Sequence, residues 1–492
     1  MALRYKTLGA AEWLPDLPDW NNPGCTVATG VIPGANSYRP FPSSTVVSGA
    51  MAERVQGAFA CTDSDGNTVV FAGTATKLYK FTNTDSTWED VSNGTYATPA
   101  DGFWSFAKFG TRIIATNLVD NVQSFVLGSS TDFADLAGSP PKAKFVCVAG
   151  DQVFLGHLST DQQGVAWCGT DDPTTWAASQ TTLADSQSLV HESGGHVTGL
   201  VGGDYVTVYQ ERAIFRGDFV GAPLIWQFRN LVQNRGCKAP GSIIPINKGS
   251  YFLSDDGFYF FNGSGTQEIG KNKVDKTFYT ALDDDYLYRV NGSIDPINSL
   301  VMWAFPSGAT AGTPNRILIY NYSVGRWSQI TGVEYEFIFP DLSKGYTLEQ
   351  LDAINASVDA LPFSLDSRAW TGGNLILAAF DTDHKLVAFT STYLAATVET
   401  AEYELCAPQR CFVSNLRPIV EGTSVTVTCA LGYREVSSAS PTYASAVAVN
   451  THGYSPQRNS SRKHRARISI AAAGTWSHVA GVEVEYQTDG MR

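Results

Sequence analysis

The run Phe103-Trp-Ser-Phe-Ala-Lys-Phe-Gly-Thr-Arg-Ile-Ile-Ala115 contains two short strand-like segments, Phe103–Phe109 and Arg112–Ala115. Two aromatic residues follow, Phe125 inside a third segment and Phe133 at the opening of a fourth. Short runs rich in β-branched and aromatic residues, separated by turn formers, are typical of antiparallel strands. This stretch therefore predicts one small four-stranded sheet.

The same four-part pattern occurs six times between residues 56 and 330. The first segments are Gln56–Cys61, Phe103–Phe109, Phe145–Val148, His196–Val201, Ser242–Ile246 and Arg289–Ile294. The second segments are Val69–Phe71, Arg112–Ala115, Gln152–Leu155, Tyr205–Tyr209, Tyr251–Leu253 and Leu300–Phe305. The third segments are centred on Tyr79, Phe125, Trp167, Phe215, Phe260 and Tyr320, and the fourth begin at Trp88, Phe133, Trp176, Trp226, Gln267 and Trp327. Four strands in a period of about 45 residues predict a β-propeller.

Edge and face burial explain why such units form a ring. One four-stranded sheet cannot bury both faces and leaves two open edges, whereas sheets packed around an axis bury their aromatic and branched side chains. We expect the aromatic residues that open the fourth strands to fill equivalent positions between blades; they are Trp88, Phe133, Trp176, Trp226 and Trp327. The repeats predict six blades over residues 51–340, with five or seven as alternatives if a terminal strand closes the ring.

The segments on either side of the repeats have a different character. Residues 1–50 contain six prolines, which set an extended path, with Trp13 and Trp20 between them. This segment either packs on the chain's own second domain or docks on a neighbouring subunit. Residues 341–492 return to strand-like runs after a predicted helix at Thr347–Leu361, whose apolar residues are spaced by three and four. We expect a mainly all-β protein in which these residues form a second, β-rich platform domain that the N-terminal arm joins.

Composition and charge exclude several classes of protein. The chain has 492 residues, a net charge of −13 and only 16% charged residues. This acidity argues against a module that holds nucleic acid on a general basic surface. No stretch approaches the length of a membrane span, and the N-terminus has no apolar signal region. We expect synthesis in a cytoplasm and no membrane span.

The cysteines indicate neither disulfides nor zinc. The chain has eight, and only Cys406 and Cys411 lie close together in the sequence. Their four-residue gap, with no second pair and no flanking histidine, is poor zinc spacing. We expect free thiols, as is usual in a cytoplasm.

No motif indicates catalysis, a cofactor or a metal. The histidines of His191-Glu-Ser-Gly-Gly-His196 are five residues apart, which spoils the helical geometry of a zinc motif, and Asp63-Ser-Asp-Gly-Asn67 lacks the glutamate of a calcium loop. Thr84–Trp88 and Asp171–Trp176 resemble the Asp boxes of sialidase propellers but lack their glycine. A pair of carboxylates that cleaves glycosides is left as an open alternative, because the distance between two such groups is set by the fold and not by the sequence. We expect a protein that is not an enzyme.

One dense basic run stands out in this acidic chain. It contains Arg458, Arg462, Lys463, Arg465 and Arg467. It is either a solvated loop that leads into a strand at Arg465–Ala471, or a contact for an acidic partner protein or DNA phosphate. With Trp13 and Trp20, these residues are the candidate assembly contacts.

Several phrases of the sequence resemble a known family. They are Arg4-Tyr-Lys-Thr7, Glu12-Trp-Leu-Pro-Asp-Leu-Pro-Asp19, Val31-Ile-Pro-Gly34, Tyr38-Arg-Pro-Phe-Pro42, Ser254-Asp-Asp-Gly-Phe-Tyr259, Phe261-Asn-Gly263, Ile269-Gly270, Asp295-Pro296, Trp303, the helix from Thr347, Thr392–Thr400 and Gly481-Val-Glu-Val-Glu-Tyr486. Together they resemble the tail hub or nozzle proteins of short-tailed bacteriophages. The phrases run nearly end to end and are structural rather than catalytic.

The resemblance implies a structural role in a virion. In that family a propeller and a platform form one subunit of a hexameric ring below the portal and its adaptor. The ring extends the DNA ejection channel and anchors tail fibres or a needle, and DNA passes through it transiently. The expected location is the virion tail, after assembly in the host cytoplasm. The alternative is a receptor-binding or glycan-binding propeller, or a polysaccharide depolymerase.

Overall fold

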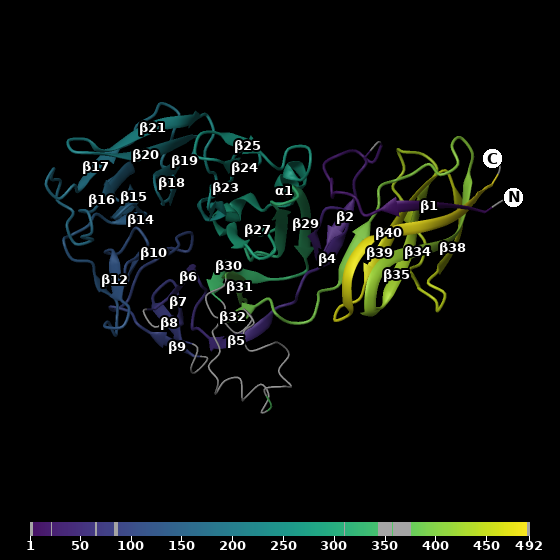
Figure 1. The fold of residues 1–492 in the computed structure, drawn as a ribbon, viewed down its shortest axis with the longest axis horizontal. Coiled ribbons are helices and arrows are strands. Elements are labelled where there is room, and N and C mark those ends of the chain that lie inside the picture. The colour runs from purple at the N-terminus through teal and green to yellow at the C-terminus, as the bar shows by residue number, and fades with distance from the viewer. Residues whose placement is uncertain are drawn as a thin grey trace.

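The computed structural model describes residues 3–20, 22–63, 66–82, 87–308, 310–342, 357 and 375–489. Within them the regular secondary structure is almost wholly β-strand, which confirms the expected all-β class. The strands form a ring of small sheets and, beside it, a two-layer β-sandwich (Figure 1). The ring is a β-propeller.

The first six blades of the propeller follow the sequence repeats closely. Each consists of four antiparallel strands in chain order, and those of the sixth blade belong to a ten-stranded sheet. Their strands are β6 (Gly57–Thr62), β7 (Thr68–Gly73), β8 (Leu78–Thr82) and β9 (Trp88–Asp90); β10 (Ser105–Phe109), β11 (Arg112–Thr116), β12 (Gln123–Val126) and β13 (Ala134–Asp135); β14 (Ala143–Ala149), β15 (Gln152–Leu158), β16 (Asp161–Trp167) and β17 (Asp185–Ser188); β18 (Val197–Val201), β19 (Val206–Gln210), β20 (Ala213–Gly221) and β21 (Ile225–Gln233); β22 (Ile244–Ile246), β23 (Gly249–Leu253), β24 (Phe258–Phe261) and β25 (Thr266–Glu268); β26 (Asn291–Asp295), β27 (Leu300–Phe305), β28 (Arg316–Asn321) and β29 (Arg326–Thr331).

A seventh blade closes the ring, so the expected number of six is too low. It contains β30 (Tyr335–Leu342), β31 (Leu375–Asp381), β32 (Lys385–Ala388) and, as its outer strand, β5 (Thr45–Ala50) from the N-terminal segment. β30 packs against both β26 and β6. The expected domain boundary at residue 340 therefore falls inside a strand, and the ring extends to Ala388. β5, from near the N-terminus, completes the seventh blade, which is the alternative of ring closure by a terminal strand given in the sequence analysis.

The N-terminal and C-terminal segments together build the sandwich. One sheet contains β3 (Val31–Pro33), β4 (Tyr38–Pro40), β40 (Thr475–Thr488), β34 (Cys411–Ser424) and β38 (Ser455–Ser461), with β1 (Arg4–Gly9) also paired to β40. The other contains β2 (Val27–Thr29), β33 (Ala396–Glu399), β39 (Lys463–Ile470), β35 (Val427–Arg434), β36 (Thr442–Tyr443) and β37 (Val447–Ala448). Figure 1 shows β1 lying among the C-terminal strands. The Pro-rich segment thus packs on its own chain.

One β-sheet runs through both halves of the molecule. β2 pairs with β33 of the sandwich and, in parallel, with β29 of the sixth blade through Thr29 and Gln329. Of the short helices, α1 (Asp275–Ala281) meets the N-terminal segment at this junction, whereas η1 (Pro240–Ser242) and η2 (Asp284–Arg289) contact each other, and η1 also contacts the inner strand β26. The Asp16 carboxylate accepts hydrogen bonds from the backbone N–H groups of Lys276 and Thr277 in α1, at 2.9 and 2.8 Å. Except for Ser357, the predicted helix at Thr347–Leu361 lies outside the described residues.

Four of the five aromatic residues assigned to blade packing contact the blade before their own. The Trp88 ring lies 5.6 Å from Phe380 of the seventh blade, and Phe133 lies 5.6 Å from Phe71 of the first. Trp226 meets Phe154, and Trp327 meets Phe258, with ring centroids 4.9 and 5.4 Å apart. Aromatic pairs at these separations stabilise packing beyond their buried area.

Trp176 also packs against a core of residues from the second and third blades, but it departs from the strand pattern. The fourth strand of its blade, β17, begins nine residues later at Asp185. Trp176 lies in the preceding turn, where its indole N–H donates to the Pro173 carbonyl at 2.8 Å. The assignment of Trp176 to a fourth strand is therefore wrong, because an aromatic after a polar turn also occurs in a long loop.

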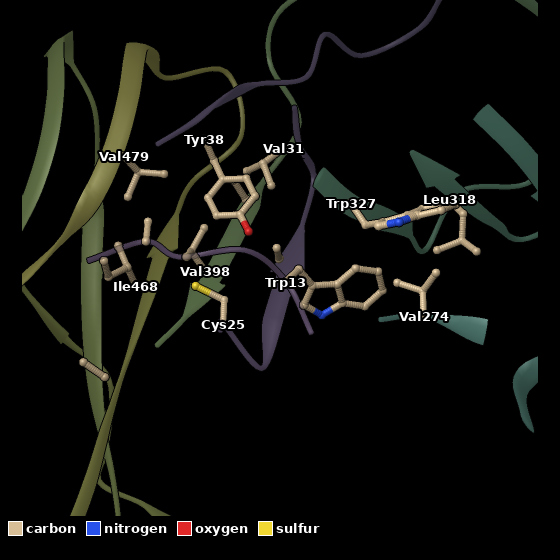
Figure 2. Close-up of a cluster of buried hydrophobic side chains, with 14 of the residues drawn as sticks. Trp13, Cys25, Val31, Tyr38, Val274, Leu318, Trp327, Val398, Ile468 and Val479 are labelled. Atoms are coloured by element: carbon tan, nitrogen blue, oxygen red, sulfur yellow. The ribbon is translucent and has the colours of Figure 1, made fainter. Parts of the chain in front are cut away.

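Buried side chains from the sandwich and the propeller meet in one core. Trp13, on the N-terminal segment, lies between Cys25 and Val398 on the sandwich side and Val274 and Trp327 on the propeller side (Figure 2). Its side chain is 1% exposed, and its indole N–H donates to the Thr26 carbonyl at 3.2 Å. The junction is thus a continuous hydrophobic core rather than a flexible linker.

Candidate functional site

The residues expected at assembly contacts separate into buried and exposed groups. Trp13 belongs to the core of its own chain, which contradicts its assignment as a surface contact. Trp20 is 69% exposed, with the Lys463 amino group 5.3 Å above its ring. Arg458 and Arg462 are also exposed. Of the predicted set, Trp20, Arg458 and Arg462 present the freest side chains to a partner.

The basic run is not a loop, because it crosses from one sandwich sheet to the other. Arg458 lies in β38, which ends at Ser461, and Lys463 opens β39. Lys463 and Arg465 are only 8% and 5% exposed. The two expectations for this run, a solvated loop and a free basic contact, are both wrong for these two residues. Both side chains form ion pairs within the sandwich.

A network of ion pairs accounts for this burial. Arg434 binds the Glu402 carboxylate with both Nε and Nη2, at 2.6 and 2.9 Å. Arg465 reaches Glu402 at 3.2 Å and Asp19, from the N-terminal segment, at 2.7 Å. Buried charges are tolerated only when they are paired in this way. We name Asp19, Glu402, Arg434 and Arg465 the sandwich charge network.

Neighbouring residues extend the same network. Lys463 lies 3.0 Å from Glu404, and Arg467 lies 2.7 Å from Glu399. Burial alone would lower the pKa of Arg465, but the hydrogen bonds and charges of Asp19 and Glu402 raise it overall. The guanidinium therefore stays charged, and the N-terminal segment is held to the sandwich by charge as well as by packing.

His464 lies in the same strand but is buried without a hydrogen bond to its ring from any described residue. It is 1% exposed, and neither ring nitrogen has a hydrogen-bond partner among the described residues. Burial lowers the pKa of His464 to about 4. The folded protein thus keeps this imidazole neutral at a pH where the unfolded chain protonates it.

We expect acidification to destabilise the fold through His464. Because the folded pKa is depressed, the unfolded state binds more protons between pH 6.5 and about 4, and stability is lost as the pH falls through that window. The difference corresponds to roughly 3 kcal/mol between pH 7 and pH 4. Urea unfolding across this range should show that His464→Phe removes this part of the pH dependence. Substitution of the exposed His452 by Phe should leave it in place; equal slopes in both variants would contradict the assignment.

Three cations lie at the same end of the propeller axis, at or just before the start of a first strand. The first strands of the blades are neighbours around the ring, as β6, β10, β14 and β18 show, so their starts gather at the same mouth. Arg54 lies just before β6, Lys144 is the second residue of β14, and Arg289 lies just before β26. We name these three residues the mouth cations.

Partial burial marks the mouth cations as an unusual group. Burial lowers the pKa of each of them, and the Arg54 charge lowers that of Arg289 further. The Arg54 guanidinium donates to the Ala100 carbonyl at 2.8 Å, while Arg289 Nε has no hydrogen-bond partner among the described residues. Glu336 is the acid near Arg54 and Arg289, and its carboxylate accepts the Val55 N–H at 3.3 Å, whereas Asp101 lies near Lys144. Cations in such a setting suit an anionic group such as a carboxylate or sulfate.

Two histidines continue the polar surface beyond Lys144. The His157 ring lies 5.1 Å from that of His196, and His196 Nδ1 lies 3.3 Å from Glu211. Burial lowers the pKa of His157, whose Nδ1 is 2.8 Å from the Val197 carbonyl oxygen. The sequence contained a signal for this region, because His196 and Arg289 both open first segments of the repeat. A comparison of the residues at this position in all six repeats would have shown that polar and charged side chains recur there.

The chemical motifs set aside in the sequence analysis do not assemble in space. No three His, Cys, Asp or Glu residues in the described part of the chain are arranged to hold a metal ion. His191 contacts Ser193, whereas His196 contacts Glu211. Asp63 accepts a hydrogen bond from the Asn67 N–H at 2.8 Å, as in a hairpin turn. Within the described residues, no helix has the length and apolar character needed to cross a membrane.

Comparisons with known proteins add little beyond the fold. No family model and no curated protein matches the chain. Among solved structures, it is similar to YCF48 bound to a D1 peptide (12% identity, 72% of this chain and 96% of that chain covered, TM-score 0.38). It is also similar to a chain of the mitotic checkpoint complex (11%, 73% and 98%, 0.40) and to the computationally designed Ika8 protein (8%, 78% and 100%, 0.38). At such low identities and TM-scores, no argument about function rests on them.

Proposed function

We propose that the protein is a structural subunit of a virion, the tail nozzle or hub of a short-tailed bacteriophage. In this role several copies, most simply six, form a ring that extends the DNA ejection channel below the portal adaptor and anchors fibres or a needle. DNA would pass through the centre of the ring of subunits, not along the axis of one propeller. The sequence resemblance motivates the proposal.

The observation that carries the proposal is the rigid junction between propeller and sandwich. The N-terminal segment contributes β1 to β4 to the sandwich and β5 to the seventh blade, so it ties both halves together. Arg326 of the sixth blade donates to the carbonyls of Gly34 and Ala35, both at 2.6 Å, and Lys273 lies 2.6 Å from Glu12. A subunit that transmits force within an assembly needs a rigid junction between its domains. A protein whose domains move relative to each other does not.

A non-catalytic role is part of the proposal. The charges of the sandwich charge network bind one another in structural pairs, an arrangement that offers no nucleophile paired with a base. Assembly in the host cytoplasm and final location in the virion tail follow from the same proposal.

The proposal predicts a large ring. Purified protein should sediment as an oligomer far above 53.0 kDa and appear as rings in negative-stain images. Trp20→Ser combined with Arg462→Glu should weaken ring formation in a salt-dependent way, because both side chains are exposed and one is charged. Circular dichroism should be unchanged, with Lys248→Glu as a control at another exposed site. A wild-type protein that folds but stays monomeric would contradict the proposal.

The mouth cations favour a second candidate, a propeller that binds acidic glycans. Arg54, Lys144 and Arg289 would bind uronic acid or sulfate groups, and neutral sugars should bind much less. This candidate predicts saturable binding by isothermal titration calorimetry and a small oligomer. Ring formation without glycan binding would favour the tail nozzle. Glycan binding by a small oligomer that forms no ring would favour the glycan-binding propeller.

A further inference from the structure

The loop Cys406-Ala-Pro-Gln-Arg-Cys411 brings two thiols together at the end of the sandwich. Cys411 opens β34, and the Gln409 N–H donates to the Cys406 carbonyl at 2.8 Å, which turns the chain back on itself. The two Sγ atoms lie 2.7 Å apart. All eight cysteines are free and buried, but this pair alone has a sulfur-to-sulfur contact among the described residues.

The other thiols have different surroundings. Cys168 and Cys237, for example, donate to backbone carbonyls at 3.2 and 3.1 Å. Cys25 and Cys429 are fully buried in the junction core. These thiols behave as small apolar side chains, which is the usual role of a buried cysteine.

The pair is fixed by its neighbours on several sides. Cys411 is paired in register with Ser461 of β38 and Thr488 of β40. Between the two cysteines, Arg410 donates to the Ser460 carbonyl at 2.9 Å and lies 2.8 Å from Glu435. The loop cannot easily carry one thiol away from the other, so their contact is a property of the fold.

Reagents can approach the loop from solvent. Ala407, Pro408 and Gln409 line a surface cavity of about 320 Å³, whose wall also includes Trp20. Cys406 is 7% exposed, whereas Cys411 is fully covered. An oxidant would therefore meet Cys406 first, and Cys411 would act as the resolving thiol.

We propose that Cys406 and Cys411 form an intramolecular disulfide when the protein meets an oxidising environment. The Cys406 thiolate attacks one sulfur of a small disulfide such as oxidised glutathione and releases one glutathione thiolate, which takes up the proton. The Cys411 thiolate then attacks the Cys406 sulfur of the mixed disulfide and releases the second glutathione. One disulfide is formed, one is reduced, and two protons pass to glutathione. The inference does not rest on the proposed function.

Thiol counting tests the proposal directly. Folded protein is incubated with oxidised glutathione, quenched in acid, denatured and alkylated, and its intact mass is measured. We expect six of the eight cysteines to be alkylated and two to be protected, against eight after reduction. Trypsin cleaves after Arg410, so the Cys406 and Cys411 peptides should stay joined until they are reduced. Fragmentation distinguishes Cys411 from Cys429, which lies on the same peptide.

Single substitutions provide the controls. Cys406→Ser and Cys411→Ser should each abolish the linked peptides, whereas Cys429→Ser should keep them. The wild-type measurement stands even if a variant fails to fold. Eight alkylated cysteines after oxidation, stable glutathione adducts in place of the link, or a link that survives Cys411→Ser would each overturn the proposal.

Discussion

Trp13→Ala is expected to lower the free energy of unfolding by about 3–5 kcal/mol, because it opens a large cavity in a closed core. The Trp13 side chain is 1% exposed and lies where sandwich and propeller side chains meet (Figure 2). The substitution also leaves the Thr26 carbonyl without its indole donor. Urea unfolding followed by tryptophan fluorescence and circular dichroism measures the effect.

Trp20→Ala is the matched control for this experiment. The two tryptophans lie seven positions apart in the same Pro-rich segment, but Trp20 is 69% exposed. Its contact with Lys463 is of the exposed cation–π kind, so its loss should cost no more than about 1 kcal/mol. Similar losses in both variants would mean that the segment is not anchored through Trp13.

The blades could be predicted from the sequence because their signal is local. A strand buried in a sheet needs branched and aromatic residues in a short run, and Leu300–Phe305 occurs as β27 with the bounds expected from the sequence. The aromatic residues Phe133, Trp226 and Trp327 contact the preceding blade because each repeat presents the same face to its neighbour. Because the same local pattern is repeated six times, it was sufficient to predict these blades.

The seventh blade could not be predicted in this way. Its outer strand Thr45–Ala50 pairs with Lys385–Ala388, which lie far away in the chain, and no fourth aromatic marks it. Pairing between distant segments is decided by the closure of the ring, not by the residues of either strand alone. The expected boundary at residue 340 failed for the same reason.

The sandwich charge network was missed because charge usually indicates a surface. Arginine and lysine are almost never fully buried unless paired, so Lys463 and Arg465 suggested solvent or a partner. Their actual partners, Asp19 and Glu402, come from separate parts of the sequence. The usual alternation of buried and exposed residues along a strand could not identify these charges as buried either, because the first four residues of β39 are all buried. Only the fold brings these acids and bases together.

The network makes Glu402→Ala the second substitution with a large expected effect. Glu402 accepts two hydrogen bonds from Arg434 and one from Arg465, and both arginine side chains are about as buried as the carboxylate. Removing the acid takes the most buried carboxylate partner from Arg434 and leaves the partly exposed Asp19 as the carboxylate that both arginines share. Breaking a buried ion pair in this way typically costs about 3–5 kcal/mol. Thermal and urea unfolding should both show this loss.

Two further variants separate the network from ordinary surface ion pairs. Glu435 pairs with Arg410 at 2.8 Å but is 45% exposed, so Glu435→Ala should cost less than about 1 kcal/mol. Arg434→Ala combined with Glu402→Ala should cost clearly less than the sum of the single substitutions, because the second change removes a charge that the first left unpaired. Additive losses, or a Glu402→Ala variant as stable as Glu435→Ala, would show that the buried ion pairs do not stabilise the sandwich.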